Sequence, residues 1–124
     1  MNRFLFTSFL TIFICDLVLS SSVDADDTDR LKFFETKIRP VLVEHCYSCH
    51  SAEADEIEGG LALDSREGIR AGGESGASVV PKSLDKSLIL KAIGYDDSFY
   101  EMPPDGKLPN YILKDFEKWI ADGA

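Results

Sequence analysis

Two cysteines and a histidine stand together in the run Cys46-Tyr47-Ser48-Cys49-His50. Residues three apart lie on one side of a helical turn, so the two thiols can reach two vinyl groups on one edge of a porphyrin and form thioethers. The histidine that follows can turn its imidazole under the iron as the proximal ligand. Because this spacing is typical of c-type haem attachment, we expect Cys46 and Cys49 to bind haem c and His50 to ligate its iron.

Two other interpretations of the same cysteines stay open. Cys46 and Cys49 could form a disulfide or a redox-active dithiol, although no alternation of strands and helices of the thioredoxin kind surrounds them. They could also bind zinc together with His50, but a tetrahedral site needs a fourth ligand and the chain has no second cysteine pair to supply it. A structural disulfide or a zinc site would make the chain a non-redox interaction module.

The distal iron ligand is predicted to be Met102. It is the one methionine besides Met1, and it lies 52 residues after His50. The adjacent Pro103 and Pro104 restrict the backbone and lower the entropy that is lost when the loop becomes ordered. A lone methionine otherwise often fills a gap in a core. With a haem motif in the same chain, we expect it to be an axial ligand.

Ligation by His50 and Met102 would fill both axial positions and raise the reduction potential relative to two histidines. It favours outer-sphere transfer of single electrons over oxygen or peroxide chemistry, so the chain is predicted to be an electron carrier and not an enzyme. His45 lies beside Cys46 on the same local segment as His50 and cannot reach the opposite face of a haem. We expect it to be a partly exposed helix residue.

The first 25 residues are expected to be a signal peptide. Residues 1–3 give a positive start, residues 4–19 are mostly apolar, and small residues at 20–25 suit cleavage after Ala25. The apolar run is 16 residues long and contains Asp16, which makes it short for a membrane span. The prediction is an exported protein of the periplasm or cell envelope without membrane insertion after cleavage, and the alternative is an uncleaved membrane anchor.

Cleavage would leave residues 26–124 as one domain, and it would remove Cys15, the odd cysteine. The full chain of 124 residues carries 13 basic and 22 acidic residues, for a net charge of -9. This balance argues against nucleic-acid binding, which needs a basic surface to meet phosphates. The remaining 12 basic and 20 acidic residues predict redox donor and acceptor proteins with a basic docking surface.

The elements that must position these residues are predicted to be helices joined by long loops. Apolar residues recur at helical spacing, and cap residues and glycines mark the ends of the segments. Pro40 should break or kink the first segment, because proline lacks an N–H and disfavours helical geometry before it. The expected fold class is a small all-α domain, with helices over Asp29–Arg39, Pro40–Cys46, Ser65–Ala71, Leu84–Ile93 and Pro109–Ala121.

The chain resembles the planctomycete-type cytochrome c domain over roughly Phe33 to Ala124. The haem motif and Met-Pro-Pro occur in many cytochromes c, whereas the glycine-rich strings at 59–66 and 72–76 are more particular to this family. Lys82 is a departure, because the family commonly has glycine after Val-Pro. The motifs are Phe33-Phe34-Glu35, Ile38-Arg39-Pro40-Val41-Leu42, Cys46-Tyr47-Ser48-Cys49-His50, Gly59-Gly60-Leu61-Ala62-Leu63-Asp64-Ser65-Arg66, Gly72-Gly73-Glu74-Ser75-Gly76, Val79-Val80-Pro81, Met102-Pro103-Pro104 and Trp119-Ile120-Ala121-Asp122-Gly123-Ala124.

The resemblance implies a cytochrome c-like helical fold, covalent haem c at Cys46 and Cys49, and iron ligation by His50 and Met102. In that family the domain usually heads a longer protein with further domains. The leading hypothesis is an exported monohaem cytochrome that carries single electrons. The alternative is a haem subunit or fragment that serves an attached or partner catalytic protein, such as a peroxidase or dehydrogenase.

Overall fold

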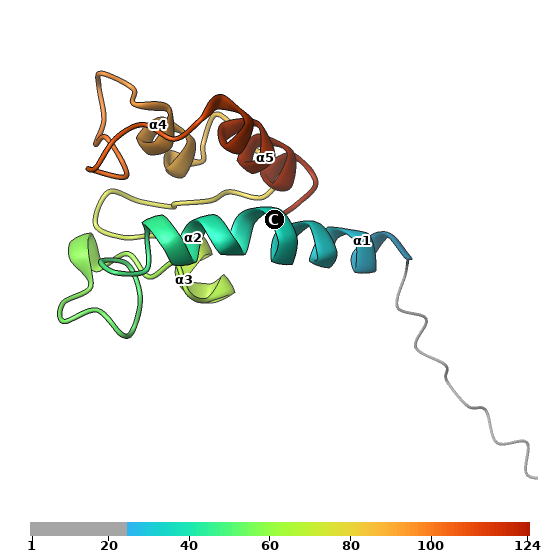
Figure 1. Cartoon of the computed structure of the whole chain (residues 1–124), viewed down its shortest axis with the longest axis horizontal. Helices are drawn as coiled ribbons and strands as arrows, with labels where there is room; N and C mark the ends of the chain where they lie inside the picture. The colour runs from blue at the N-terminus through green and yellow to red at the C-terminus, as the bar shows by residue number, and fades with distance from the viewer. Residues whose placement is uncertain (1–24) are drawn as a thin grey trace, which may run out of the picture.

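A computed structural model describes residues 25–124 of the chain (Figure 1). The predicted signal peptide therefore lies, except for Ala25, outside the described residues, and so does Cys15. Within residues 25–124, no helix combines the length and the hydropathy needed to cross a membrane.

The N-terminal part is a continuous helical rod (Figure 1). It comprises α1 (Ala25–Phe33), a π-helical turn (Phe34–Ile38) and α2 (Arg39–His45). The predicted break at Pro40 is replaced by this wider turn, in which the N–H of Arg39 donates to the carbonyl of Phe34. Proline then falls in the first turn of α2, where its missing N–H costs nothing. Single π-turns of this kind absorb a residue that an α-helix cannot accommodate.

The remaining helices match the sequence to different degrees. The helix α3 (Arg66–Ala71) begins after Ser65, whose hydroxyl accepts the N–H of Gly68 at 3.0 Å. The helix α5 (Asn110–Ala121) lies within one residue of its predicted start. A short 3-10 turn covers Glu58–Gly60. No strand occurs between residues 25 and 124, where β-pairing is limited to two isolated bridges, so the all-α prediction is confirmed.

The predicted helix at Leu84–Ile93 is wrong in its first half, since α4 spans Leu88–Gly94. The cause is the fully buried hydroxyl of Ser87. It donates to the carbonyl of Ser83 at 2.7 Å and accepts the N–H of Val80 at 2.9 Å. These contacts, which join residues four and seven apart, hold residues 80–87 in turns, and they outweigh the helical pattern of the side chains.

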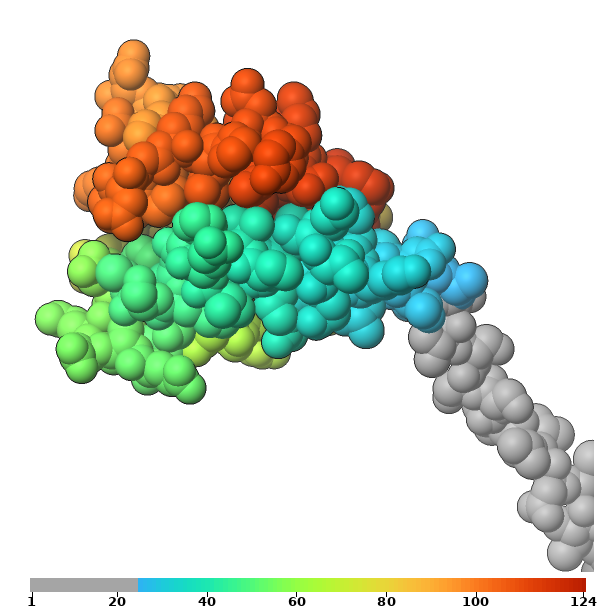
Figure 2. Space-filling model, in the orientation of Figure 1, coloured from blue at the N-terminus to red at the C-terminus, as the bar shows by residue number. Residues whose placement is uncertain are grey.

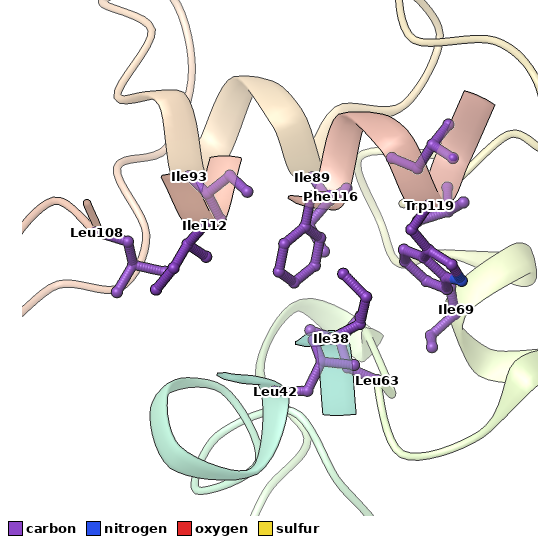
Figure 3. Close-up of a cluster of buried hydrophobic side chains, with 12 residues drawn as sticks. Ile38, Leu42, Leu63, Ile69, Ile89, Ile93, Leu108, Ile112, Phe116 and Trp119 are labelled. Atoms are coloured by element: carbon purple, nitrogen blue, oxygen red, sulfur yellow. The ribbon is translucent and has the colours of Figure 1, made fainter. Parts of the chain in front are cut away.

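Two layers enclose the core. The N-terminal layer consists of the rod, α3 and the loops that join them, and the C-terminal layer consists of α4, α5 and the loop between them (Figure 1). In Figure 1, α4 and α5 lie above the rod and α3 lies below it, and the space-filling view shows the N-terminal and C-terminal residues meeting along one seam (Figure 2). Ile38 and Leu42 of the rod face Phe116 of α5 across this seam (Figure 3). All three side chains are at most 1% exposed. Each buried side chain of this size contributes about 1.5–3 kcal/mol, so the seam holds the layers together.

Aromatic packing fixes the angle between the rod and α5. The ring of Trp119 lies 5.4 Å from that of Phe34 and 5.9 Å from that of Phe116, the latter edge to face. Offset and edge-on pairs at these distances are favourable beyond the area they bury. Phe116 and Trp119 therefore pack helix on helix.

Lys82 adopts the left-handed backbone conformation, with φ of 63°. This is the conformation that glycine takes without a steric cost, which explains why glycine suits the position. The N–H of Lys82 donates to the carbonyl of Ile120 at 2.8 Å and ties the turn to the end of α5. The departure from the resembled pattern is thus accommodated locally and leaves the fold unchanged.

Candidate haem site

The Cys-x-x-Cys-His run continues directly from the end of α2. The N–H groups of Cys46 and Tyr47 both donate to the carbonyl of Leu42 at 2.9 Å, and the N–H of His50 donates to the carbonyl of Cys46 at 2.9 Å. The two cysteines therefore stand on one further turn at the end of the rod. They are separate, half-buried thiols, with no disulfide between them.

His50 is oriented by a backbone carbonyl. Its Nδ1 lies 3.2 Å from the carbonyl oxygen of Leu61, and its own carbonyl accepts the N–H of Leu63 at 2.7 Å. An imidazole that donates Nδ1–H to this carbonyl keeps the lone pair of Nε2 free for a metal. No pattern in the sequence indicates this partner, because any residue type offers the same carbonyl.

The segment that carries this carbonyl is itself held by glycines. Gly59 and Gly60 both adopt left-handed conformations, with φ of 60° and 64°. The carbonyl of Gly59 accepts the N–H of Glu74 at 2.8 Å. At Gly73 a Cβ would lie only 3.0 Å from the Cβ of Leu61. The glycine strings at 59–60 and 72–76 thus allow two loops to pack closely behind His50.

A cavity of about 490 Å³ opens beside these residues, and both layers contribute to its walls. Cys46, Cys49 and His50 line it from the N-terminal layer, and Met102 lines it from the C-terminal layer. All four residues that the sequence singled out are therefore brought together. His45 lines the same cavity and is half-buried, with Nε2 3.8 Å from the carboxylate of Glu44.

The other walls are mainly apolar. Ile89, Ala92 and Ile93 of α4 and Leu61 and Leu63 of the N-terminal layer line the cavity. Among the aromatic residues, Phe99 and Tyr100 line it, whereas Tyr111 is 67% exposed on α5. Five other aromatic residues do not line this cavity, namely Phe33, Phe34, Tyr95, Phe116 and Trp119.

These walls fit a flat, largely apolar group that carries a few polar substituents. Ser78 lines the cavity, and its buried hydroxyl finds no hydrogen-bond partner among residues 25–124. A buried hydroxyl without a partner costs about 1–3 kcal/mol, so a bound group or water is expected to satisfy it. Gly73 and Gly76, which have no side chains, also line the cavity and leave room for such a group.

The thiol environment disfavours the alternative of a reactive dithiol. Burial raises the pKa of Cys46 to about 11, and the neighbouring Cys49 adds to the shift. Redox-active dithiols need a lowered thiol pKa, because the thiolate is the nucleophile. Among residues 25–124, no group of three or more His, Cys, Asp or Glu side chains is placed to hold a metal ion, as the zinc alternative would require.

A second cavity of about 480 Å³ lies between α1, α3 and the C-terminal residues. Arginines surround it, including Arg66 and Arg70, and Trp119 lies in its wall. None of Cys46, Cys49, His50 and Met102 lines this cavity. It is separate from the candidate haem site.

Comparison with known proteins agrees with the geometry. No curated protein and no solved structure matches the chain significantly. Residues 46–106 match the family model described as Planctomycete cytochrome C. The match begins at Cys46 and extends past the Met102-Pro103-Pro104 loop, so it includes every predicted haem-binding residue. The match over residues 46–106 supports a planctomycete-type cytochrome c domain, which implies covalently bound haem c with its iron.

Proposed function

We propose that the protein is an exported monohaem cytochrome c that carries single electrons through a haem ligated by His50 and Met102. The observation that carries this proposal is the shared cavity, into which the haem-attachment motif and the Met-Pro-Pro loop project from opposite layers. The bound haem supplies reversible one-electron chemistry at its iron. Two protein ligands would leave no iron position free for a substrate, which favours a carrier over an enzyme.

The residues of the chain have separable tasks in this proposal. Cys46 and Cys49 anchor the porphyrin through thioethers, and His50 ligates the iron through Nε2 while its Nδ1–H donates to the carbonyl of Leu61. Met102 supplies the sixth ligand from the opposite wall. The apolar side chains of α4 exclude water, which keeps the surroundings of the iron nearly unchanged during electron transfer.

The boundaries of the domain, its location in the cell and its redox partners are part of the same proposal. Residues 1–25 act as a signal peptide, and residues 26–124 form the cytochrome c domain in the periplasm or cell envelope. Its redox partners carry a basic docking surface. This is supported by the acidic residues exposed on two loops at the cavity, Glu53, Asp55, Glu56 and Glu58 on one and Asp96, Asp97, Glu101 and Asp105 on the other. The range 51–60 and the range 95–106 contain no lysine or arginine.

The test begins with the protein exported from cells that make c-type cytochromes. We expect a haem-staining band that survives denaturing electrophoresis, a pyridine-treated spectrum of haem c, and a near-infrared thioether-to-iron band in the oxidised protein. Met102→Ala should abolish that band, and Met102→His should lower the reduction potential. Leu84→Ala, at a leucine that is 41% exposed and outside the cavity, is the matched control.

The same spectra distinguish an electron carrier from the alternative, a haem subunit that serves a catalytic protein. A haem subunit built for peroxidase chemistry would show a labile or absent sixth ligand in the wild type. In that case Met102→Ala would leave the spectrum and the potential unchanged, and the carrier proposal would be wrong. The absence of a covalent haem band would favour the zinc or disulfide module instead.

A further inference from the structure

The loop that carries Met102 is attached to the end of α4 at two points. The N–H of Met102 donates to the carbonyl of Ala92 at 3.0 Å. The phenol hydroxyl of Tyr95 donates to the carbonyl of Pro103, the residue directly after Met102. The two hydrogen bonds therefore hold the backbone on both sides of the methionine side chain. Each of them joins the loop to the C-terminal end of α4.

Tyr95 occupies an unusual position for its residue type. It ends α4 in the left-handed conformation, with φ of 57° and ψ of 51°. Glycine or asparagine normally fills such a position, because a larger side chain is crowded there. Gly94 directly precedes it, yet the turn is made at the tyrosine. Tyrosine at the helix end supplies something that glycine cannot, namely a hydroxyl that reaches the next loop.

The Tyr95 side chain contacts the Met102 loop without lining the cavity. Met102, Pro103 and Pro104 line the cavity, whereas Tyr95 is half-buried and does not. A residue in this place contacts the loop backbone and leaves the haem face free.

We infer that Tyr95 is a positioning residue that holds the Met102 thioether in the cavity through its hydrogen bond to the carbonyl of Pro103. The inference rests on the proposed ligation of the iron by Met102. Without the phenol hydroxyl, the loop is held on one side of the methionine only, and Met102 is displaced more easily by a competing ligand. One hydrogen bond of ordinary strength changes such an equilibrium about 2- to 10-fold.

The experiment measures imidazole binding to the oxidised holoprotein by the shift of its Soret band. Imidazole must displace the thioether, so its apparent affinity reports how firmly Met102 is held. We expect Tyr95→Phe to raise this affinity about 2- to 10-fold. The control is Tyr111→Phe, which removes the same hydroxyl from a tyrosine that is 67% exposed on α5, and it should leave the affinity at the wild-type value.

A double-mutant cycle distinguishes this effect from a general loss of stability. In the Met102→Ala background there is no thioether to displace, so Tyr95→Phe should no longer change imidazole binding. An equal effect of Tyr95→Phe in both backgrounds, or no effect in the wild-type background, would overturn the inference about Tyr95. If Met102→Ala itself binds imidazole as the wild type does, the proposed ligation fails instead, and the two failures are distinguished.

Discussion

Replacing Gly73 by alanine tests whether the glycine loops support His50. The added Cβ would lie 3.0 Å from the Cβ of Leu61 and 3.2 Å from its N, and closer still to the carbonyl oxygen of Gly59. Carbon atoms normally stay about 3.5–4.0 Å apart, so the segment 59–61 must move. Overpacking of this kind costs about 1–3 kcal/mol. Loss of the hydrogen bond from Glu74 to Gly59 adds about 0.5–1.5 kcal/mol.

We therefore expect Gly73→Ala to lower the free energy of unfolding of the holoprotein by about 1.5–4.5 kcal/mol. The assay is equilibrium unfolding in guanidinium chloride, followed by far-ultraviolet circular dichroism. The reduction potential of the same variant should also shift, because the displaced carbonyl of Leu61 is the one that orients His50.

Gly94→Ala is the matched control. It makes the same change at a glycine of α4 whose added Cβ would meet nothing within 4 Å and whose φ is not left-handed. Alanine is the better helix former by about 0.8–1 kcal/mol in a helix interior, so this variant should be as stable as the wild type or slightly more stable. If the free energies of unfolding of Gly73→Ala and Gly94→Ala differ by less than about 0.5 kcal/mol, the close approach of the two loops does not affect stability and the reasoning is refuted.

Three further outcomes are expected. Ser65→Ala removes the cap of α3 and should cost about 0.5–2 kcal/mol in the same unfolding assay, and an unchanged midpoint would contradict the capping role. Protein made without haem, as the double variant Cys46→Ala and Cys49→Ala, should melt without a cooperative transition. Without haem the mainly apolar walls of the 490 Å³ cavity would be exposed to water, and a domain has only about 5–15 kcal/mol of stability in all; a sharp, near-native melt would refute this. Electron transfer with the physiological partner should slow as salt rises, since opposite charges steer the encounter, and stopped-flow rates that do not depend on salt would exclude a basic docking surface.

Local signals predicted the helices whose ends depend on local contacts. Ser65 caps α3 with its own hydroxyl, and the spacing of Ile112, Phe116, Trp119 and Ile120 defines the buried face of α5. In both cases the stabilising contact is visible within one or two turns of sequence. The residues that meet at the candidate haem site were predictable for a different reason, because the spacing Cys-x-x-Cys-His is typical of haem attachment and only one internal methionine was available.

Contacts between side chains and backbone that helical periodicity does not encode explain what the sequence did not reveal. The first half of the predicted helix at residues 84–93 is lost to Ser87, whose partners in the turns at Val80 and Ser83 cannot be read from helical periodicity. The sequence predicts that Pro40 interrupts the first helix. The π-turn that accommodates it depends on which side of the rod packs against α5, and this is a tertiary contact. The support of His50 by the carbonyl of Leu61 and of the Met102 loop by Tyr95 arises from tertiary proximity alone.

The placement of the cysteines in one layer and Met102 in the other bears on how the protein matures. Thioether formation requires a porphyrin to reach Cys46 and Cys49, and in the folded chain the segment Met102-Pro103-Pro104 lines the same cavity. If the chain is exported as proposed, the haem motif also crosses the membrane before that segment. We therefore expect haem attachment to occur on a chain whose C-terminal layer has not yet docked, and docking of that layer to be the last step of biogenesis.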